Sequence, residues 1–563
     1  MDQFSTYRTD SSASKEKAGA LITEWNYLFG LRGVWASHWT EIAERIYPME
    51  SFLFQNYQML TTQGDKRNFE IFDSTGVLAL QKFGAILDSL LTPRDQIWHQ
   101  LKPGDERLLK DKGCRLWFEG ANKVLLSERY KSTANFASQN QKQYLSLGAY
   151  GTGVMFIDAL AGNPGLRYRN VHLGESYLKE NHQGVIDSNF RHYMMTARQA
   201  FQKWGENCPK HIQERVDKQP EQPFYFLHCV QPRNDRDIER RDYKGMEYES
   251  YDVSIEAQEV IKESGYRQFP YAVSRYFQTT NETYGRSPAM DVLPALKTLN
   301  EEKLSMLKQA HRVLDPVLLA HDDGILSGFS LEPGAVNWGG VDSNGRTLVQ
   351  ALPTGNIQIG KEAMDDERAL IKDTFLISLF DILTENPEMT ATQVLERVKE
   401  KGMLIAPTVG RQNDEYLGPL IERELDVLSS QGLLPPMPPL LKQAKGEYKI
   451  IYDSPISRTQ RSEQSAGVMR TIEAFSQYAQ ATGDTSPLDL INMDKAGVEI
   501  AQTNAVPDSF IRSKKEIMAI RQQKAQAQQQ QQQIQAAPAV AGLMKAKAMM
   551  PQGGGGGGQL PQQ

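Results

Sequence analysis

The stretch from Tyr284 to Gly324 constrains this chain most, because it predicts one long helix with marked ends. Ser287 can cap the free N–H groups of a first turn, and Pro288 suits the first helical position. Asp315-Pro316 disfavours further helix before the proline. The run His321-Asp322-Asp323-Gly324 predicts a second terminus after a short extension.

This expected helix has a wide apolar face and a charged edge. Pro294 lies inside the run and predicts either a kink or a helix that begins there. At 100° per residue, seven apolar side chains fall on an arc about 140° wide: Leu293, Leu296, Leu299, Leu304, Leu307, Ala310 and Leu314. A charged stripe follows one edge: Lys297, Glu301, Lys308 and Arg312, of which the first two form an i, i+4 pair. Such a helix is either a core helix with a solvated edge or a strut packed against copies of itself.

The remaining pattern predicts an α+β fold that is mainly helical, with a real core because 40% of the 563 residues are hydrophobic. Length alone suggests about three or four domains. We expect helices over residues 13–47, 72–93, 112–130, 135–148, 196–204, 362–383, 390–401, 410–430, 456–482 and within 487–505. We expect strands within 153–191, at 224–230, within 248–276 and at 348–352, and a charged excursion at 232–245.

Composition narrows the class of protein. The chain has no run of about 18 apolar residues and no signal-peptide pattern, so we expect a soluble protein that is not secreted by that route. Cys114, Cys208 and Cys229 are too few and too scattered for a disulfide framework or a zinc knuckle. These features fit a reducing compartment.

The net charge of −6 conceals an asymmetry between body and tail. From Arg512 onward the chain has seven basic residues and one acidic, which leaves −12 for the body. An acidic body argues against a tight nucleic-acid binder, but it permits a surface that DNA passes without sticking. After about Arg521 the sequence is rich in Gln, Ala and Gly, and we expect it to be disordered.

One enzyme motif is nearly complete. Residues 355–361 match G-x-x-x-x-G-K between an expected strand and helix, the context of a phosphate-binding loop. Glu362 stands where Ser or Thr should hold Mg²⁺, and its carboxylate would repel phosphate. Residues 376–381 resemble a Walker B run but lie inside a helical pattern. Nucleotide hydrolysis is therefore kept only as an alternative.

Other candidate sites have simpler explanations. Residues 148–153 precede a strand, which favours a turn over a dinucleotide fingerprint. His172, His182 and His192 are ten positions apart without the partners of a metal motif. His321-Asp322-Asp323 could hold a cation, but a helix terminus explains it equally well. We expect no catalytic residue, metal or cofactor.

Several segments, taken in order over about residues 13–505, resemble the head-to-tail connecting (portal) proteins of short-tailed bacteriophages. The matching residues are Trp39-Thr40-Glu41-Ile42-Ala43 through Tyr47-Pro48; Phe72-Asp73-Ser74-Thr75-Gly76 through Leu90-Leu91-Thr92-Pro93 and Trp98; Asn135-Phe136 with Gly151-Thr152-Gly153; His228-Cys229-Val230-Gln231-Pro232-Arg233; Phe269-Pro270-Tyr271 with Arg275-Tyr276; Tyr284-Gly285-Arg286-Ser287-Pro288; and Ser454-Pro455-Ile456-Ser457-Arg458.

The resemblance implies a ring of about twelve copies around a DNA channel, with wing, stem, clip and crown regions. By position in the sequence, the implied regions are an N-terminal helical region and wing at 1–195, a first stem helix within 196–223, a clip at 224–284, a second stem helix at 285–323, wing strands, a tunnel loop (353–361) and its following helix at 324–385, a helical wing or crown at 386–510, and a disordered tail at 511–563.

The same resemblance suggests which residues face DNA. In the tunnel loop they are Gly355, Asn356, Gln358, Gly360 and Lys361, and on the stem helix they are Lys297, Lys308 and Arg312. Glycines at both ends would let the loop shift as DNA moves, so we expect Gly355→Pro to impair packaging more than ring assembly. Normal genome filling by that variant would refute the idea.

The implied function is a connector at one capsid vertex, through which double-stranded DNA is packaged and ejected. Its implied partners are further copies of itself, the terminase large subunit, a tail adaptor, and capsid and scaffolding proteins, with no membrane insertion. It would belong to the virion and assemble in the host cytoplasm. The alternatives are a P-loop-like NTPase or another virion structural or scaffold protein without a channel. The basic, Gln-rich tail would either touch DNA or internal proteins or be simply solvated.

Overall fold

A computed structural model describes residues 5–7, 12–50, 70–94, 96–105, 107–108, 111–320, 330–341, 343–352, 357–377, 405–443, 447–452, 455–483, 486, 490–503, 510, 512 and 516–528. Side chains are described for all of these except 5, 7, 357–359, 455–465 and 499. The chain divides into two compact units. Unit 1 comprises Met1–Lys102, Gly120–Pro436 and Lys449–Gln460, and unit 2 comprises Pro103–Glu119, Met437–Tyr448 and Arg461–Gln563.

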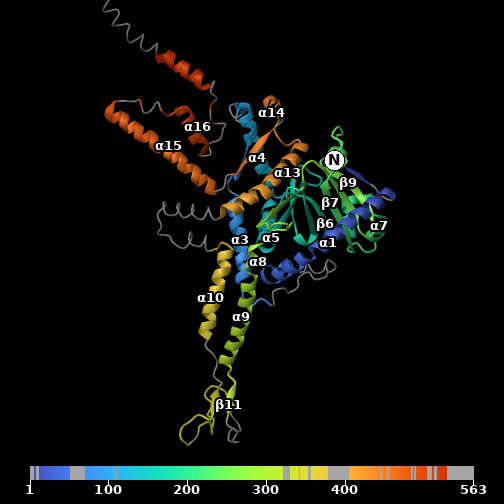
Figure 1. Cartoon of the computed structure of the whole chain (residues 1–563), viewed down its shortest axis with the longest axis vertical. Helices are drawn as coiled ribbons and strands as arrows, with labels where there is room; N and C mark the ends of the chain where they lie inside the picture. Colours follow the sequence, from blue (N-terminus) through green and yellow to red (C-terminus); the bar gives the residue numbers. More distant parts are fainter. Residues whose placement is uncertain are drawn as a thin grey trace, which may run out of the picture. The chain divides into compact units, whose positions relative to one another are not determined.

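A six-stranded antiparallel sheet lies in unit 1, with strand order β1-β9-β8-β7-β6-β5 (Figure 1). Its strands are β1 (Ser5–Tyr7), β5 (Ser176–Glu180), β6 (Ile186–Thr196), β7 (Pro223–Pro232), β8 (Tyr248–Ser254) and β9 (Glu259–Tyr266). The expected strands at 224–230 and within 248–276 are confirmed. Residues 224–266, expected to form a clip, therefore supply inner strands of this sheet.

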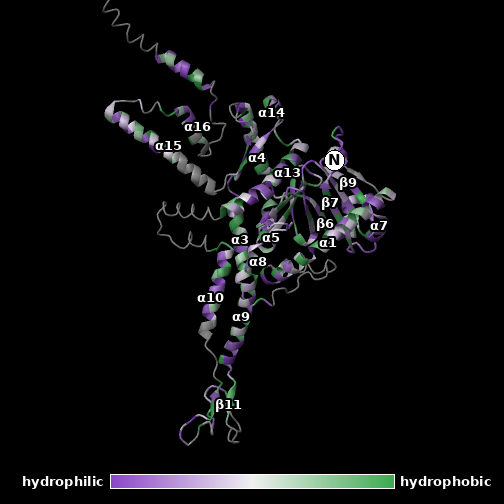
Figure 2. Cartoon of the chain, in the orientation of Figure 1, coloured by the Kyte–Doolittle hydropathy of each residue, from purple (hydrophilic) through white to green (hydrophobic). Residues whose placement is uncertain are grey.

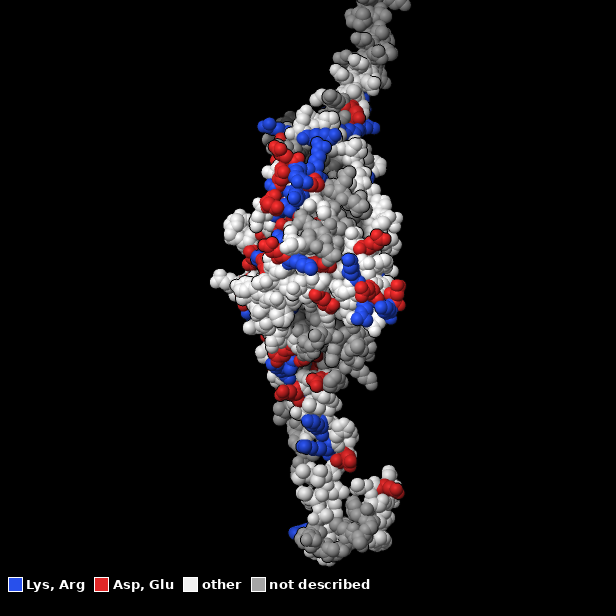
Figure 3. All heavy atoms as spheres, turned by 90° about the vertical axis from the view of Figure 1, so that its right-hand side faces the viewer, with Lys and Arg blue, Asp and Glu red and all other residues white. Residues whose placement is uncertain are grey.

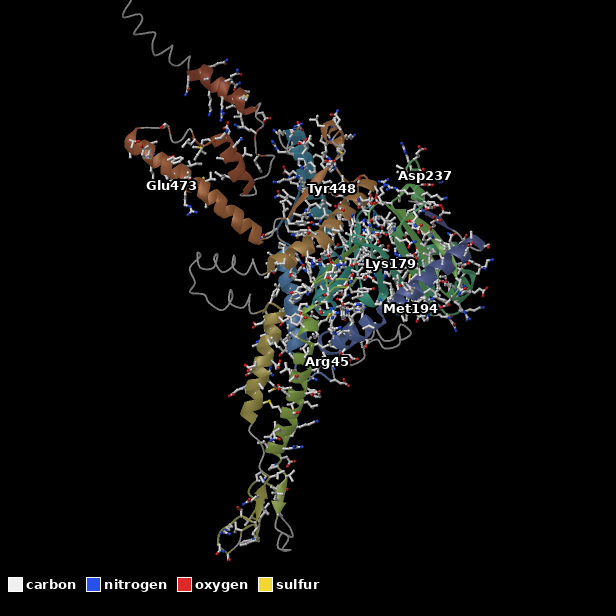
Figure 4. All side chains as sticks on the ribbon, in the orientation of Figure 1. Arg45, Lys179, Met194, Asp237, Tyr448 and Glu473 are labelled. Carbon is white, nitrogen blue, oxygen red and sulfur yellow. The ribbon has the colours of Figure 1, made fainter. Side chains whose placement is uncertain are left out.

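The long helix α1 (Ser12–Ile46) covers one face of this sheet. Ala18, Leu21 and Leu28 recur near helical spacing and pack on strand residues that include Phe190 and Leu227. Across its polar edge, Glu24 of α1 forms an ion pair with Lys179 of β5, which Figure 4 labels. The apolar stripe of α1 thus makes half of the sheet's core.

Two short helices, α6 (Ala197–Trp204) and α7 (Lys210–Val216), pack on the opposite face. Thr196 and Gln199 form a capping box that starts α6. Helix α6 has eight residues, of which Ala197, Ala200 and Trp204 are buried in the core under the sheet. A helix this short, committed to the sheet, differs from the stem helix that the sequence suggested for 196–223.

A second, three-stranded sheet has the order β10-β3-β4 and consists of β3 (Thr152–Ala159), β4 (Leu166–Val171) and β10 (Tyr271–Arg275). Helix α5 (Phe136–Tyr150) packs on it, and α3 (Thr75–Leu91) packs on α5. Gly151 ends α5 with φ +74°, and a Cβ there would lie 2.3 Å from the Gly285 carbonyl oxygen. Of the turn predicted at 148–153, only Gly151 lies between helix and strand, and only glycine fits there.

Residues 288–374 form a segment that we call the arm. It consists of α8 (Pro288–Asp291), α9 (Leu293–Leu314), the antiparallel hairpin of β11 (Leu318–Ala320) and β12 (Val349–Ala351), and α10 (Ile357–Thr374). Helices α9 and α10 lie side by side and lead to the hairpin (Figure 1). The start of α9 near Pro294, its end at Asp315 and the strand at 348–352 are confirmed. The short helical extension is not, because 318–320 is a strand, and 321–324 lie outside the described residues.

The remaining elements complete each unit. In unit 1 a π-helical turn, Asn413–Leu417, leads into α13 (Gly418–Ser430). Others are β2 (His99–Pro103), paired with β13 (Tyr448–Tyr452), then α4 (Lys112–Arg129), α14 (Pro439–Gln443), α15 (Pro455–Thr482) and α16 (Met493–Thr503). The mixture of helices and antiparallel sheets confirms the α+β class. The helix expected at 390–401 lies outside the described residues.

Part of the C-terminal segment predicted to be disordered forms a helix. Residues 516–528 are helical, and Arg521 Nη1 donates to Asp494 Oδ2 at 2.9 Å. Their Ala, Gln and Lys content favours helix, so the prediction of disorder from residue 511 is wrong for this part. Among the described residues, none of the helices is both long and apolar enough to cross a membrane.

Candidate functional site

The arm is fixed at its base by a buried helix cap. Ser287 Oγ accepts a hydrogen bond from the Met290 N–H at 3.1 Å and donates to the Ala149 carbonyl at 2.8 Å. The backbone leaves the helical path at Val292 (φ −96°, ψ 4°), so that α9 begins next to Pro294. The cap expected from Ser287 is confirmed, and it also ties the arm to α5.

The segment of residues 70–73, directly before α3, binds both helices of the arm. Asn300 of α9 accepts from the Phe72 N–H at 2.7 Å and donates to the Glu70 carbonyl at 2.9 Å. Asp73 accepts from Arg368 Nη2 of α10 at 2.6 Å. Burial alone would raise the pKa of Asp73, but hydrogen bonds from Thr75 and Arg368 hold it below its usual value. The carboxylate is therefore ionised and links α10 to the rest of unit 1 outside the arm, which we call the body.

The three cations predicted to line the arm differ in their surroundings. Lys297 forms an ion pair with Glu41 of α1, in place of the pairing predicted with Glu301. Arg45, which Figure 4 labels, lies one turn after Glu41 in the last turn of α1. Lys308 and Arg312 lie further along the same side of α9, and their side chains are exposed. The Lys297 side chain is itself 43% exposed, so the prediction that these cations face DNA stays open for all three.

The apolar face of α9 changes its environment along the helix. Leu293, Leu296 and Leu299 are buried against the body, whereas Leu307 is 40% exposed and Leu314 is 83% exposed. The first half is thus a core helix, and the second half leaves its apolar side chains uncovered in a single chain. The core-helix interpretation is confirmed for the first half, and a strut packed against copies of itself stays a prediction for the second half.

The predicted tunnel loop is shorter than expected. Helix α10 begins at Ile357, so the loop prediction is wrong for 357–361, and Gln358, Gly360 and Lys361 are helical. Gly360 and Lys361 are exposed, and no atom lies within 4 Å of a Cβ built at Gly360. The helical residues around it outweigh the cost of one glycine, about 1 kcal/mol. Gly355 and Asn356 lie outside the described residues.

The β11–β12 hairpin and the residue before it expose large apolar side chains, which we call the hairpin patch: Val317, Leu319, Leu331, Val336, Trp338 and Val341. Trp338 is 87% exposed. Neighbouring Asn337 orders the loop through two hydrogen bonds of 2.7 Å with the Ser330 backbone. Figure 2 colours β11 as hydrophobic, and Figure 3 shows mostly uncharged atoms at this end of the arm. An exposed apolar surface of this kind marks a contact site.

Comparison with known proteins identifies the family. The family model described as bacteriophage head to tail connecting protein matches residues 18–511. The chain belongs to this family of connecting proteins. It is 26% identical over 533 residues to the "Probable portal protein" of Bordetella phage BPP-1, covering 91% of this chain and 92% of that protein. It is 25% identical over 499 residues to the "Portal protein" of Salmonella phage epsilon15, covering 87% and 88%.

Among solved structures, the neck of an empty gene transfer agent particle aligns with a TM-score of 0.35 and 10% identity. That alignment covers 70% of this chain and 86% of the other. A likeness this weak carries no argument about the connecting protein's fold.

The histidines of this connecting protein are held in separate surroundings. His172 Nδ1 accepts from the Gly174 N–H at 3.0 Å, and His192 stacks on Tyr225 with ring centroids 5.5 Å apart. His182 is exposed. In the part of the chain that the structure describes, no group of three or more His, Cys, Asp or Glu side chains could hold a metal ion. His321-Asp322-Asp323 lies outside that part.

Sequence reasoning missed the contacts that hold the body together. Glu424 of α13 accepts from Arg129 Nε of α4 at 2.9 Å and from the Tyr168 hydroxyl at 2.6 Å. Arg275 of β10 donates to Glu415, in the π-helical turn, at 3.1 Å. These partners are more than a hundred residues apart, so no local pattern could reveal them.

Proposed function

We propose that this chain is a portal protein, forming a ring of about twelve copies at one vertex of a phage capsid. The observation that carries the proposal is the exposed apolar surface of the arm. The second half of α9 leaves apolar side chains uncovered from Leu307 to Leu314, and the hairpin patch is exposed as well. A heterologous contact repeated around an axis would cover them on every copy. The portal names of the two relatives support the same function.

The packing of the arm supports a revised assignment of regions. Helix α10, rather than α6, lies beside α9, so we assign α9 and α10 as the two stem helices. The hairpin between them becomes the clip, in place of 224–284. The two sheets with α1, α3 and α5 become the wing, and the elements after residue 405 become the helical wing or crown.

In this ring the channel would carry double-stranded DNA during packaging and ejection. We propose that four cations with exposed or partly exposed side chains face it: Lys297, Lys308, Arg312 and Lys361. They would do so together with Gly355, Asn356, Gln358 and Gly360 near the start of α10. Each neutralised phosphate adds affinity, so a few cations on an acidic body would guide DNA without holding it.

We propose that the hairpin patch docks the partners of the connector, namely the terminase large subunit and later the tail adaptor. Trp338 is suited to anchor such a contact, because large exposed aromatic side chains dominate binding energy at interfaces. We expect Trp338→Ala to weaken terminase binding by about 2 kcal/mol without changing thermal unfolding, as measured by calorimetry. Equal affinity would exclude this residue from the contact.

The protein would be a structural component of the virion, assembled in the host cytoplasm with capsid and scaffolding proteins, and not an enzyme. Electron-microscope imaging and the solution mass of the purified protein test this. Rings of about twelve subunits with an axial hole would support the portal function. A monomer without a ring, combined with ATP hydrolysis that Lys361→Ala abolishes, would favour the nucleotide-hydrolysing alternative. Larger assemblies without a channel would favour another virion structural protein.

A further inference from the structure

A row of polar side chains crosses the six-stranded sheet on the face away from α1. The strand register places Ser176 opposite Arg191, Arg191 opposite His228, and His228 opposite Asp252. Their sequence neighbours, including Phe190, point to the α1 side and belong to the apolar core there. Because side chains alternate along a strand, the polar row faces the other way.

This row faces the three-stranded sheet. His228 Nδ1 lies 2.7 Å from the Tyr271 hydroxyl of β10, which bridges the two sheets. Arg169 of β4 interacts electrostatically with Arg191, and its side chain is exposed. Both sheets belong to unit 1, so this seam between them lies within one compact body.

The seam contains buried polar atoms without a hydrogen-bond partner among the described residues. They are Ser176 Oγ, Asn189 Oδ1 and Nδ2, and Arg191 Nη2. Ser176 and Asn189 are fully buried, and Arg191 is 5% exposed. Buried polar atoms are rarely left without a partner in a native protein. A ligand or ordered water therefore belongs in this seam.

The charged side chains in the seam favour an anion as that ligand. Arg191 Nε donates to Glu175 Oε2 at 2.9 Å, which uses one edge of its guanidinium and neutralises one charge. Arg169 adds a second guanidinium. Although Arg169 is exposed, loss of part of the hydration of its guanidinium lowers its pKa, and the nearby Arg191 lowers it further. An anion beside both side chains would relieve this unfavourable pair of cations.

The spacing suits a small ion. Directly opposite residues on neighbouring strands have Cβ atoms about 5 Å apart and diagonal neighbours about 7 Å, so Ser176, Asn189 and Arg191 can reach one tetrahedral oxyanion. The hydroxyl, the amide Nδ2 and Nη2 are all donors. The phosphodiester backbone of a DNA duplex is too bulky to reach two fully buried side chains.

We propose that the seam between the two sheets binds a free inorganic oxyanion, such as phosphate, through Arg169, Arg191, Asn189 and Ser176. The site lies within one chain and does not depend on ring assembly. The bound ion would join β4 of one sheet to β5 and β6 of the other, and so stabilise the body of the protein.

Equilibrium dialysis of the full-length protein with radiolabelled inorganic phosphate tests the proposal, at constant ionic strength set with chloride. We expect saturable binding, equimolar with the chain, and a higher Tm in phosphate than in chloride. Arg169→Gln removes an exposed side chain and should weaken binding about tenfold or more, since a hydrogen bond to a charged group is lost. Its Tm in chloride shows whether it folds.

Arg198→Gln is the matched control, because it removes the same charge from an exposed side chain on α6, whose ion pair is with the exposed Glu221. This variant should bind phosphate as the unchanged protein does. An equal loss in both variants would indicate a general charge effect and overturn the assignment. Absence of saturable binding would mean that water alone fills the seam, and would overturn it also.

Discussion

Arg129 and Glu424 join α4 to α13 by an ion pair in which both side chains are fully buried. Removing one partner of such a pair leaves an uncompensated charge in the core. We expect Glu424→Ala to lower the free energy of unfolding by about 3–5 kcal/mol, measured by urea denaturation. Glu221→Gln, which breaks an exposed pair with Arg198, should cost less than about 1 kcal/mol.

The double variant Arg129→Met, Glu424→Leu separates charge from packing. It removes both charges and should recover much of the stability that Glu424→Ala loses. If the double variant is as unstable as the single one, the hydrogen bonds of this site, including that from Tyr168, matter more than the unpaired charge.

His192 makes stability depend on pH at the scale of one side chain. It stacks between Trp25 and Tyr225, and burial lowers its pKa to about 4. The unfolded histidine, with a pKa of about 6.5, binds a proton more readily than the folded one. The stability from neutral His192 is therefore present above pH of about 6.5 and is lost as pH falls toward about 4, by up to about 3 kcal/mol.

His192→Phe keeps an aromatic ring in the stack and removes the titrating group. We expect its unfolding free energy to fall less steeply between pH of about 6.5 and 4 than that of the unchanged protein, as measured by urea denaturation. His182→Phe changes an exposed side chain and should leave the profile unaltered. Identical slopes for both variants would mean that His192 becomes protonated without unfolding.

At the scale of elements, α10 shows that a glycine in the sequence does not by itself indicate a flexible loop. Gly360 suggested a hinge, but it lies exposed in a helix with open space around it. We expect Gly360→Ala to raise the free energy of unfolding by about 0.5–1 kcal/mol, seen as a higher Tm. Gly151→Ala is the contrasting variant, since φ is +74° and the new Cβ would meet the Gly285 carbonyl, so Tm should fall. A lower Tm for Gly360→Ala would instead support the interpretation of Gly360 as a hinge.

The accuracy of sequence reasoning followed the range of the interactions involved. The ends of α9 were predictable because Ser287, Pro294 and Pro316 act on the backbone beside them. The pairing of α9 with α10 was not, because it depends on Asp73 holding Arg368 from a distant part of the chain. The seam residues Ser176 and Arg191 are likewise unremarkable in sequence, and only the strand register places them together.

At the scale of the whole molecule, the proposed ring must cover what one chain leaves exposed on the arm. Leu314 is 83% exposed, so Leu314→Glu should leave the fold of the single chain intact. In a ring the carboxylate would be buried at every subunit contact without a partner, at a cost of about 2 kcal/mol or more. We expect association about thirtyfold weaker, measured by analytical ultracentrifugation across a concentration series.

Ile238→Glu is the control, because Ile238 is 81% exposed in the loop after β7, on the body and not on the arm. If the arm carries the contact, only Leu314→Glu shifts the distribution from rings toward single chains. If both variants assemble normally, the uncovered face of α9 serves another partner, and the contact between copies must lie on the body. If both dissociate, the interface extends over wing and stem together, and the arm alone does not determine the ring.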